Sequence, residues 1–415
     1  MGLLKNVYRR MLETFSILAF VGLAALLPLY LLSDKPTTIE INSDKDFEKY
    51  DFVGSGSEDE PYLIEGLTIS DQLFRGISIA NTKRHFIIKN CYLFRNLLDG
   101  IKIDSIADGT GKIFNNTIQE HSQSGILIIN SDNITISQNT IIESKYMIWL
   151  DNSSNCTIES NNIYAYRAPL DKESVKYRGL FVENSVNLTI TNNYIKNTAF
   201  GLYLNNVDDT IIFNNFIHIV TFSAVFILDS INVTISLTTC LESFQDFFNI
   251  RYSSFISIKN STAQDGFLGL RLFSSSNCTI NYSLFTLNKI GIQIYEECLY
   301  NNISYNEISN NEERGLIIER SNYNIIHHNA FISNNDSIEF QVEDNGSYNI
   351  WFDSVLLEGN YYQGWNISTP YQIMGSANNS DPYPLETLDI FSLPNNILHS
   401  EKIFNVEFFL KFSDG

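Results

Sequence analysis

Short runs of alternating hydrophobic and polar residues recur at a nearly constant interval along most of the chain. One copy of the unit is Gly179-Leu-Phe-Val-Glu-Asn-Ser-Val-Asn-Leu-Thr-Ile-Thr-Asn-Asn-Tyr-Ile195. We call the first residue of each unit its head, and the heads are Gly76, Gly100, Gly125, Met147, Gly179, Gly201, Ala224, Phe247, Gly269, Gly291, Gly315 and Ser337. Ten of the eleven intervals between heads are 22 to 25 residues, and the interval after Met147 is 32. A fixed period in this range indicates a solenoid, in which each unit buries its apolar face against its neighbours.

The alternation within each unit predicts β-strands. The first and third residues after every head are apolar, as in Leu180 and Val182, whereas the second and fourth vary freely. A period of two places the first set inward and the second set outward. Two further strands fit in each unit, here Leu188–Thr191 and Tyr194–Lys196, and no apolar stripe of period 3.6 appears. The pattern therefore predicts an all-β parallel solenoid of about twelve three-stranded coils.

Asparagines at two fixed places in the unit support this geometry. Eight residues after successive heads come Asn133, Asn155, Asn187, Asp209 and Asn232, and fourteen residues after come Asn139, Asn161, Asn193 and Asn215. Asparagine tolerates left-handed backbone angles and suits tight corners. Stacked amide side chains can also bond to the coils above and below.

Three segments carry a resemblance to a known family. They are the coil units, the opening Gly54-Ser-Gly-Ser-Glu-Asp-Glu-Pro-Tyr-Leu-Ile-Glu-Gly66, and the closing Gly359-Asn-Tyr-Tyr-Gln-Gly-Trp365 with Asp381-Pro-Tyr-Pro-Leu385. Over residues 38–386 the chain resembles the NosD-type right-handed parallel β-helix family. That family includes periplasmic copper-processing proteins and archaeal surface proteins, and overlaps the carbohydrate-binding and sugar hydrolase β-helices. The resemblance implies a right-handed coil and an archaeal-type surface protein, but one coil architecture hosts many activities.

The first 32 residues predict a location. Thr14–Leu32 is an uncharged apolar segment of 19 residues, just long enough to span a bilayer as a helix. Lys5, Arg9 and Arg10 precede it and acidic residues follow, so the positive-inside rule puts the bulk of the chain outside the cell. We expect an uncleaved single-pass anchor in the cell membrane; the alternative is a cleaved signal peptide.

These observations divide the chain. We expect a cytoplasmic N-terminus over residues 1–13, the membrane anchor over 14–32, and an N-terminal cap over 33–66. The parallel β-helix then covers 67–358, a C-terminal cap 359–386, and a tail 387–415. Within the cap, Asp44–Tyr50 could form a short helix.

The net charge limits the classes of molecule that the protein can bind, and the cysteine pattern indicates the state of the thiols. The formal net charge of −20 repels nucleic acid and anionic lipid, and disfavours polyanionic glycans unless calcium bridges the carboxylates. The five cysteines are scattered without a Cys-x-x-Cys pair, so we expect buried free thiols. No cofactor is predicted, although the acidic segments 99–108 and 339–344 could bind calcium weakly.

The outward column of the first strand is the predicted binding site. Reading the second residue after each head, four successive coils present Trp149, Phe181, Tyr203 and Phe226. A neighbouring polar column includes Asp151, Glu183, Asn205 and Arg251, and Arg271 follows the aromatic residues. Rings beside hydroxyl-bonding groups could stack and bind sugars. The long coil, Tyr166–Arg178, could form one wall.

The alternative hypothesis of an enzyme places its active site on the same outward face of the first strands. Asp104, Asp151, Glu183 and Arg251 would be its catalytic groups, in a hydrolase, lyase or epimerase. Adjacent coils alone bring Asp151 and Glu183 close, so their proximity is weak evidence. The adjacent His327 and His328 should face opposite sides of a strand and should not chelate together. With no His/Cys cluster and no Met-rich tract, no metal ligand set is predicted, for copper or otherwise.

The tail offers a different explanation of the aromatic column. Residues 403–412 carry Phe404, Val406, Phe408, Leu410 and Phe412 in strict alternation, and could cover the column themselves. A protein-partner patch is a further alternative. The sequence therefore predicts a membrane-anchored extracytoplasmic β-helix that binds carbohydrate or cell-surface polymer, with a polysaccharide-processing enzyme and a structural or adhesion rod as alternatives. It does not indicate the oligomeric state.

Overall fold

The computed structural model describes residues 38–387, except 71–73, 167–175, 337 and 339. All of them lie in the compact unit that begins at Thr38. The predicted membrane anchor and the C-terminal tail fall outside the described residues. Among the residues described, no helix has the length and apolar character needed to cross a membrane.

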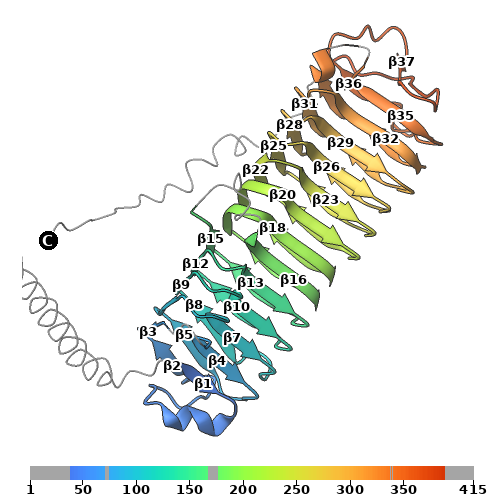
Figure 1. Ribbon diagram of the computed structural model, residues 1–415. Coiled ribbons are helices and arrows are strands. Elements are labelled where there is room, and N and C mark those ends of the chain that lie inside the picture. Colours follow the sequence, from blue (N-terminus) through green and yellow to red (C-terminus); the bar gives the residue numbers. More distant parts are fainter. Residues whose placement is uncertain (1–37, 71–73, 167–175, 337, 339, 388–415) are drawn as a thin grey trace, which may run out of the picture. The chain divides into compact units, whose positions relative to one another are not determined.

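The described chain winds into coils whose strands stack in sequence order, from β1 to β36 (Figure 1). Three columns of parallel strands result, which we call the head, second and third ladders. The head ladder contains β1 (Ile39–Ile41), β4 (Ile77–Ala80), β7 (Ile101–Asp104), β10 (Ser124–Ile129), β13 (Tyr146–Asp151), β16 (Arg178–Val186), β18 (Tyr194–Asp208), β20 (Phe216–Leu228), β23 (Asp246–Arg251), β26 (Leu268–Phe273), β29 (Ile290–Tyr295), β32 (Arg314–Asn322) and β35 (Val342–Ser347). The predicted parallel solenoid of about twelve coils is confirmed.

The other two ladders complete each coil. The second ladder contains β2 (Tyr62–Glu65), β5 (Phe86–Lys89), β8 (Gly111–Phe114), β11 (Thr135–Ser137), β14 (Thr157–Glu159), β17 (Thr189–Thr191), β19 (Thr210–Phe213), β21 (Val233–Ser236), β24 (Ser257–Lys259), β27 (Thr279–Asn281), β30 (Asn302–Ser304) and β33 (Ile325–His327). The third contains β3 (Thr68–Ile69), β6 (Tyr92–Phe94), β9 (Thr117–Gln119), β12 (Thr140–Ile142), β15 (Asn162–Tyr164), β22 (Thr239–Ser243), β25 (Thr262–Gln264), β28 (Leu284–Thr286), β31 (Glu307–Ser309), β34 (Ala330–Ile332) and β36 (Tyr361–Tyr362). The long strands β18 and β20 turn the corner and pair in both the third and the head ladders.

Aliphatic side chains fill the inside of the coils, as the alternation predicts. Ile126 is 0% exposed and Leu180 is 1% exposed, and the same holds for their counterparts along the head ladder. Removing this apolar surface from water is the main stabilising term, at about 25 cal/mol per Å². The residues between them point outward; most of them, such as Lys102 and Phe181, are half-buried, whereas Leu127 and Asn249 are buried.

The last coil differs from the prediction. Val342 pairs with Leu316 and Asp344 pairs with Ile318, so the coil starts at Gln341 and not at the predicted head Ser337. Ile338, which was expected to face inward, is 47% exposed. The Gln341 amide oxygen accepts hydrogen bonds from the backbone N and Nδ2 of Asn334, at 3.1 and 2.9 Å, and these bonds hold the register.

The left-handed corners are confirmed at the first of the two asparagine places, whereas at the second the left-handed residue is the one before the asparagine, such as Ser160 before Asn161. Asn155 and Asn187 have left-handed backbone angles, both with φ of 56°. The inner asparagines form amide ladders, in which each Oδ1 accepts hydrogen bonds from the asparagine of the coil before it; one such ladder joins Asn116, Asn139, Asn161, Asn193 and Asn215. Asn161 Oδ1, for example, accepts from the backbone N and from Nδ2 of Asn139, at 3.0 and 3.1 Å. The ladder satisfies buried backbone groups that the turns would otherwise leave unpaired.

Aromatic side chains cover both ends of the described coil stack. At the first end, the 3₁₀ helix η1 (Asp44–Lys49) carries Phe47, which stacks on Tyr62 with centroids 4.5 Å apart. Both β1 and β2 already pair in parallel with β4 and β5, so the ladders start within the segment expected as a cap. At the other end, Tyr362 stacks on Tyr371 at 3.6 Å, next to the antiparallel pair β37 (Tyr371–Gln372) and β38 (Ser380–Asp381). A short 3₁₀ turn, η3 (Asn334–Asp336), precedes β35.

All five cysteines are buried free thiols, as predicted. Burial raises the pKa of the Cys156 thiol to about 12 and also raises the pKa of Cys91. Because the thiolate is the reactive form, we expect the native protein to be inert to a thiol reagent at pH 8, and five thiols to react in guanidinium chloride. Rapid labelling of one or more thiols without denaturant would contradict this arrangement.

Candidate functional site

The aromatic column predicted from the sequence is continuous. Trp149, Phe181, Tyr203 and Phe226 occupy successive places on β13, β16, β18 and β20, each paired directly with the next. All four side chains are half-buried and point outward. We call these four residues the aromatic strip. With strands about 4.8 Å apart, the strip is about 15 Å long.

The rings of the strip differ in orientation. Phe181 and Tyr203 stack face to face at 4.5 Å and 12°, and Tyr203 and Phe226 stack at 5.0 Å and 10°. Their faces are therefore occupied by one another, and their edges point outward. The Trp149 ring lies at 88° to the Phe181 ring, so it is perpendicular to the stacked rings. Tyr146 packs against Trp149, with ring centroids 4.7 Å apart. The strip thus offers ring edges and the Tyr203 hydroxyl group more than a row of open ring faces.

A second outward column, which the sequence reading missed, widens the strip. It consists of the residues that precede each head. Tyr146, Arg178, Phe200 and Asp246 belong to it. The Arg178 guanidinium lies 5.1 Å from the Tyr146 ring centroid, and Phe200 packs edge-on against Tyr203 at 5.4 Å. Reading the sequence one place before each head would have found this column.

The polar column lies beside the strip as predicted. Asp151, Glu183 and Asn205 follow one another across β13, β16 and β18. Asn184 Nδ2 donates to Asp151 Oδ1 at 2.9 Å, and Asn205 Nδ2 approaches Glu183 Oε1 at 3.4 Å. A carboxylate accepts about four hydrogen bonds, so these two groups retain acceptor capacity for ligand hydroxyls.

Asp104 lies apart from that pair. Ile129 stands between Asp104 and Asp151 in the register. The Asp104 carboxylate binds Lys102 Nζ at 2.8 Å. Burial would raise its pKa, but the hydrogen bonds from Lys102 and Ser105 outweigh this and lower the pKa of Asp104. Asp104 is therefore an ion-paired carboxylate and not a proton donor near neutral pH.

The two arginines predicted for the site are already engaged. Arg251 Nε donates to Asn249 Oδ1 at 2.9 Å, and its guanidinium lies 5.6 Å from the Phe226 ring centroid. Arg271 pairs with Asp246 at 3.6 Å. Asp246, which was not predicted from the sequence, is only 4% exposed. Burial raises the pKa of Asp246, although the positive charges of Arg271 and Arg251 act to lower it. Beyond Phe226, the strip is therefore followed by arginine and aspartate side chains that already bind one another or Asn249.

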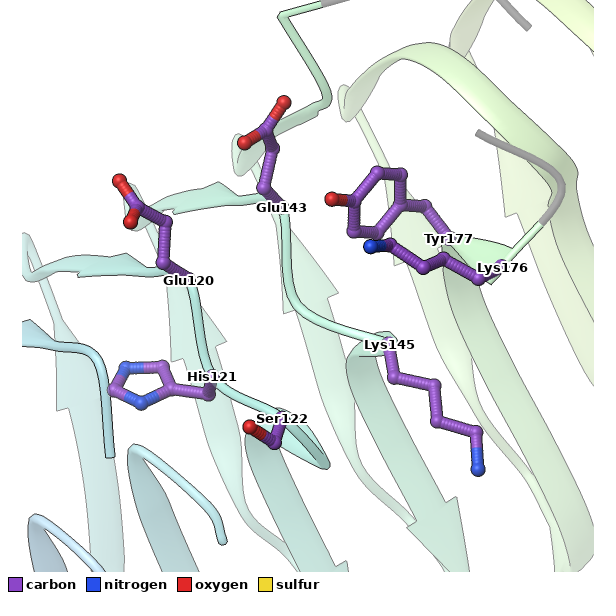
Figure 2. A pocket seen from close by; sticks show the side chains of 7 residues that line it. All are labelled: Glu120, His121, Ser122, Glu143, Lys145, Lys176 and Tyr177. Atoms are coloured by element: carbon purple, nitrogen blue, oxygen red, sulfur yellow. The ribbon is translucent and has the colours of Figure 1, made fainter. Parts of the chain in front are cut away.

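A cavity of about 430 Å³ lies near the start of the aromatic strip. Figure 2 shows Tyr177 and Lys176 on one side of it, with Glu120 and Glu143 on the other. His121 also lines it, but the His121 Nδ1 accepts from Asn96 N and its Nε2 bonds to Leu93 O, both at 3.2 Å. Burial lowers the pKa of His121 to about 4, so this imidazole is neutral and fixed by the backbone.

The structure corrects one prediction about histidines. His327 and His328 were expected to face opposite sides of a strand, yet their Nδ1 atoms lie 2.6 Å apart. The reason is that β33 ends at His327, and His328 adopts a left-handed corner conformation with φ of 54°. Together with Asp353 they form a group whose potential ligand atoms lie within 4.8 Å of one another, the one such group among the described residues. The prediction that His327 and His328 face opposite sides of a strand is therefore wrong.

The coil geometry defines a class of protein, the parallel β-helix, and comparison with known families agrees. A family model described as "Right handed beta helix region" matches residues 124–265 and 223–372, which together span more than half of the chain. The chain therefore belongs to the right-handed β-helix family. A second model, "Periplasmic copper-binding protein (NosD)", matches residues 40–171 and confirms the NosD-type resemblance.

Several solved structures are similar to this chain. The Dettilon tailspike protein is 14% identical, with 73% of this chain and 64% of that chain covered and a TM-score of 0.42. The A-module of the Azotobacter vinelandii mannuronan C-5 epimerase AlgE4 is 12% identical, with coverages of 73% and 98% and a TM-score of 0.35. The catalytic domain of a GH87 alpha-1,3-glucanase is 12% identical, with coverages of 70% and 65% and a TM-score of 0.34. At these scores the similarities say nothing about ligand or reaction. A search of curated proteins finds no match.

The residues in the NosD-type segment do not fit a copper ion. His121 uses both ring nitrogens on the backbone, and Cys91 and Cys156 are buried separately, each bonded through sulfur to carbonyl oxygens. The described part of residues 40–171 contains no group of three converging His, Cys, Asp or Glu side chains.

Proposed function

We propose that this protein is an extracytoplasmic β-helix that binds carbohydrate or a cell-surface polymer along the outer face of the head ladder. The observation that carries the proposal is the aromatic strip, which joins four coils in direct register and is flanked by acceptor groups. Contiguous, half-exposed apolar surface of this kind marks binding sites on soluble domains. The face combines apolar ring edges with carboxylate and amide groups, and a sugar likewise presents C–H and O–H groups together.

The arrangement favours a neutral glycan. Asp151 and Glu183 place two carboxylates beside the strip, in a chain of net charge −20. This field opposes polyanions such as pectin or alginate, whereas the hydroxyl groups of a neutral sugar can donate to the carboxylates. A chain bound along the strip would lie parallel to the stacking direction of the coils and contact one aromatic residue in each of four coils.

The proposed location is consistent with the family. The matching NosD family is described as periplasmic, and Thr14–Leu32 has the length and flanking charges of a single-pass anchor. We propose that the anchor holds the β-helix at the outer side of the cell membrane. The cytoplasmic N-terminus over residues 1–13 and the tail from residue 387 remain part of this proposal, whereas the β-helix itself already starts at β1 and β2, within the predicted N-terminal cap.

Truncating Trp149 tests the proposed function. We expect Trp149→Ala to weaken retention on neutral polysaccharides about tenfold or more, because truncating an aromatic hot-spot residue of an interface costs about 2 kcal/mol or more. The measurement is a pull-down and glycan array with the full-length chain, using cellulose, xylan and chitin as neutral probes and alginate as the polyanionic comparison.

Tyr300→Asn is the matched control, because Tyr300 is 59% exposed and belongs to a separate tyrosine stack with Tyr323. Thermal unfolding of each variant shows whether it is folded. If Trp149→Ala is folded and is retained as well as wild type on every glycan, the strip is not the binding face. Retention lost equally in both variants would also contradict the proposal.

The same experiment separates the enzyme alternative. If the protein turns over a bound glycan and Asp151→Asn abolishes turnover while leaving retention intact, the face is catalytic, with Asp104, Asp151, Glu183 and Arg251 as the candidate groups. Binding without turnover supports the proposal as stated. Neither binding nor turnover favours a structural or adhesion rod. Coverage of the strip by Phe404–Phe412 lies outside the described residues and would appear as binding only after the tail is removed.

A further inference from the structure

The histidine cluster at the last corner of the second ladder has the geometry of a ligand set. His327 ends β33 and is 8% exposed, and His328 at the corner is 2% exposed. Tyr305 stacks on the His328 ring at 4.6 Å and 14°, which fixes the plane of that imidazole. The two Nδ1 atoms, 2.6 Å apart, point at one another. Two buried imidazoles are thus held with their δ nitrogens converging.

Glu358 fixes the tautomer of His328. The His328 Nε2 lies 2.8 Å from Glu358 Oε2. An ionised carboxylate only accepts, so the proton sits on Nε2 and the Nδ1 of neutral His328 carries a lone pair. In the absence of a ligand, His327 Nδ1–H donates to that lone pair. A carboxylate on the far nitrogen of an imidazole is the outer-shell arrangement that orients histidine ligands of metals.

Asp353 supplies the third group. Its Oδ1 accepts from Val355 N at 2.8 Å and Leu356 N at 3.0 Å, so the turn that follows holds the carboxylate in place. Asp353 and Glu358 are joined by an antiparallel bridge, in which Asp353 N donates to Glu358 O at 2.7 Å. The ligand carboxylate and the positioning carboxylate therefore come from the two ends of one turn.

We propose that His327, His328 and Asp353 bind one divalent transition-metal ion of the zinc type. Two imidazole nitrogens and one carboxylate oxygen suit such borderline ions, and a fourth position would be left for water. Tetrahedral ligands at about 2.05 Å lie roughly 3.3 Å apart, so the imidazoles must separate slightly. His327 moves its proton from Nδ1 to Nε2 when the ion binds, which frees the second lone pair with no net change in protonation. The negative charges of Asp353 and Glu358 balance the positive charge of the ion. The bound ion would then connect the corner after β33 to the turn between Asp353 and Glu358.

Zinc binding to the full-length chain tests this site. After the protein is stripped with a chelator, we expect competition with a chromophoric chelator to give one Zn²⁺ per chain, and Co²⁺ to give the visible absorption of a four-coordinate site. Asp353→Asn, which keeps an oxygen acceptor for the turn, and His327→Gln should each abolish this binding. Glu358→Ala should weaken it about 10–100-fold, and Glu358→Gln less, because the amide oxygen still accepts from His328.

His218→Gln is the matched control. His218 Nε2 bonds to Glu242 Oε1 at 3.0 Å in a histidine–glutamate pair distant from the cluster. It should leave the stoichiometry and the Co²⁺ spectrum unchanged, and unfolding in the presence of chelator identifies any variant that fails to fold. Absence of 1:1 Zn²⁺ binding by the wild-type chain overturns the proposal. Zn²⁺ binding that survives both His327→Gln and Asp353→Asn also overturns the proposal, because the ion would then occupy unrelated surface carboxylates.

Discussion

Asn161→Ala is expected to lower the free energy of unfolding by about 3–5 kcal/mol, although it removes only one polar side chain. Asn161 Oδ1 accepts from the backbone N and from Nδ2 of Asn139, and its own Nδ2 donates to Ile136 O at 2.9 Å. Each buried polar group left without a partner costs about 1–3 kcal/mol. Alanine would remove the acceptor of the Asn139 backbone N and the Nδ2 donor to Ile136 O in the middle of the amide ladder. Asn139 Nδ2 would keep its bonds to Ile113 O and Ser137 O.

Urea unfolding of Asn161→Ala and Asn162→Ala measures this effect. Asn162 is the next residue, lies on β15 and is half-buried, so the same substitution there should change stability by less than about 1 kcal/mol. A similar loss in both variants would mean that the amide ladder contributes no more than an ordinary strand position.

Asp381 is expected to make the protein less stable as the pH rises from about 4 to about 6. The Asp381 side chain is 0% exposed, and this burial raises its pKa from 3.8 to about 6. The hydrogen bonds from Asn360 N and Tyr383 N act to lower the pKa but do not outweigh the burial. A carboxyl group whose pKa is higher in the folded state binds its proton more tightly there. Its stabilising contribution is therefore complete below the unfolded pKa and is lost as the pH passes the folded pKa.

A pKa raised from 3.8 to about 6 corresponds to about 3 kcal/mol. The measurement is the urea-unfolding free energy between pH 3.5 and 7 for wild type and Asp381→Asn. The difference between the two should decrease by about 3 kcal/mol across this range. A pH-independent difference for Asp381→Asn would show that the burial of this group does not perturb its ionisation.

The coil architecture was predictable because one short rule repeats. Inward positions such as Ile126 and Leu180 must be apolar in every coil, so the pattern is visible without any long-range information. Asn161 and Asn187 were likewise assigned to corners from their spacing alone. The rule failed at Ser337, where Ile338 and Phe340 imitate an inward pair, because the register there depends on the contact of Gln341 with Asn334.

The candidate sites were only partly predictable. The register placed Trp149, Phe181, Tyr203 and Phe226 in one column, but their ring planes depend on side-chain packing, which a sequence period does not contain. His327 and His328 were misassigned because strand alternation was applied across the end of β33. Asp353 and Glu358 reach those histidines only through the closing turn, a non-repeating segment for which the period gives no position.

Footprinting with a bound glycan tests whether the outer face of the head ladder is the binding surface. The full-length chain would be labelled by hydroxyl radicals with and without the neutral glycan that it binds best on the array. We predict protection of Trp149, Phe181, Tyr203 and Phe226, with no change at the exposed tyrosines Tyr300, Tyr323 and Tyr348. Protection confined to those tyrosines, or the lack of any bound neutral glycan, would contradict the assignment of the head-ladder face as the binding surface.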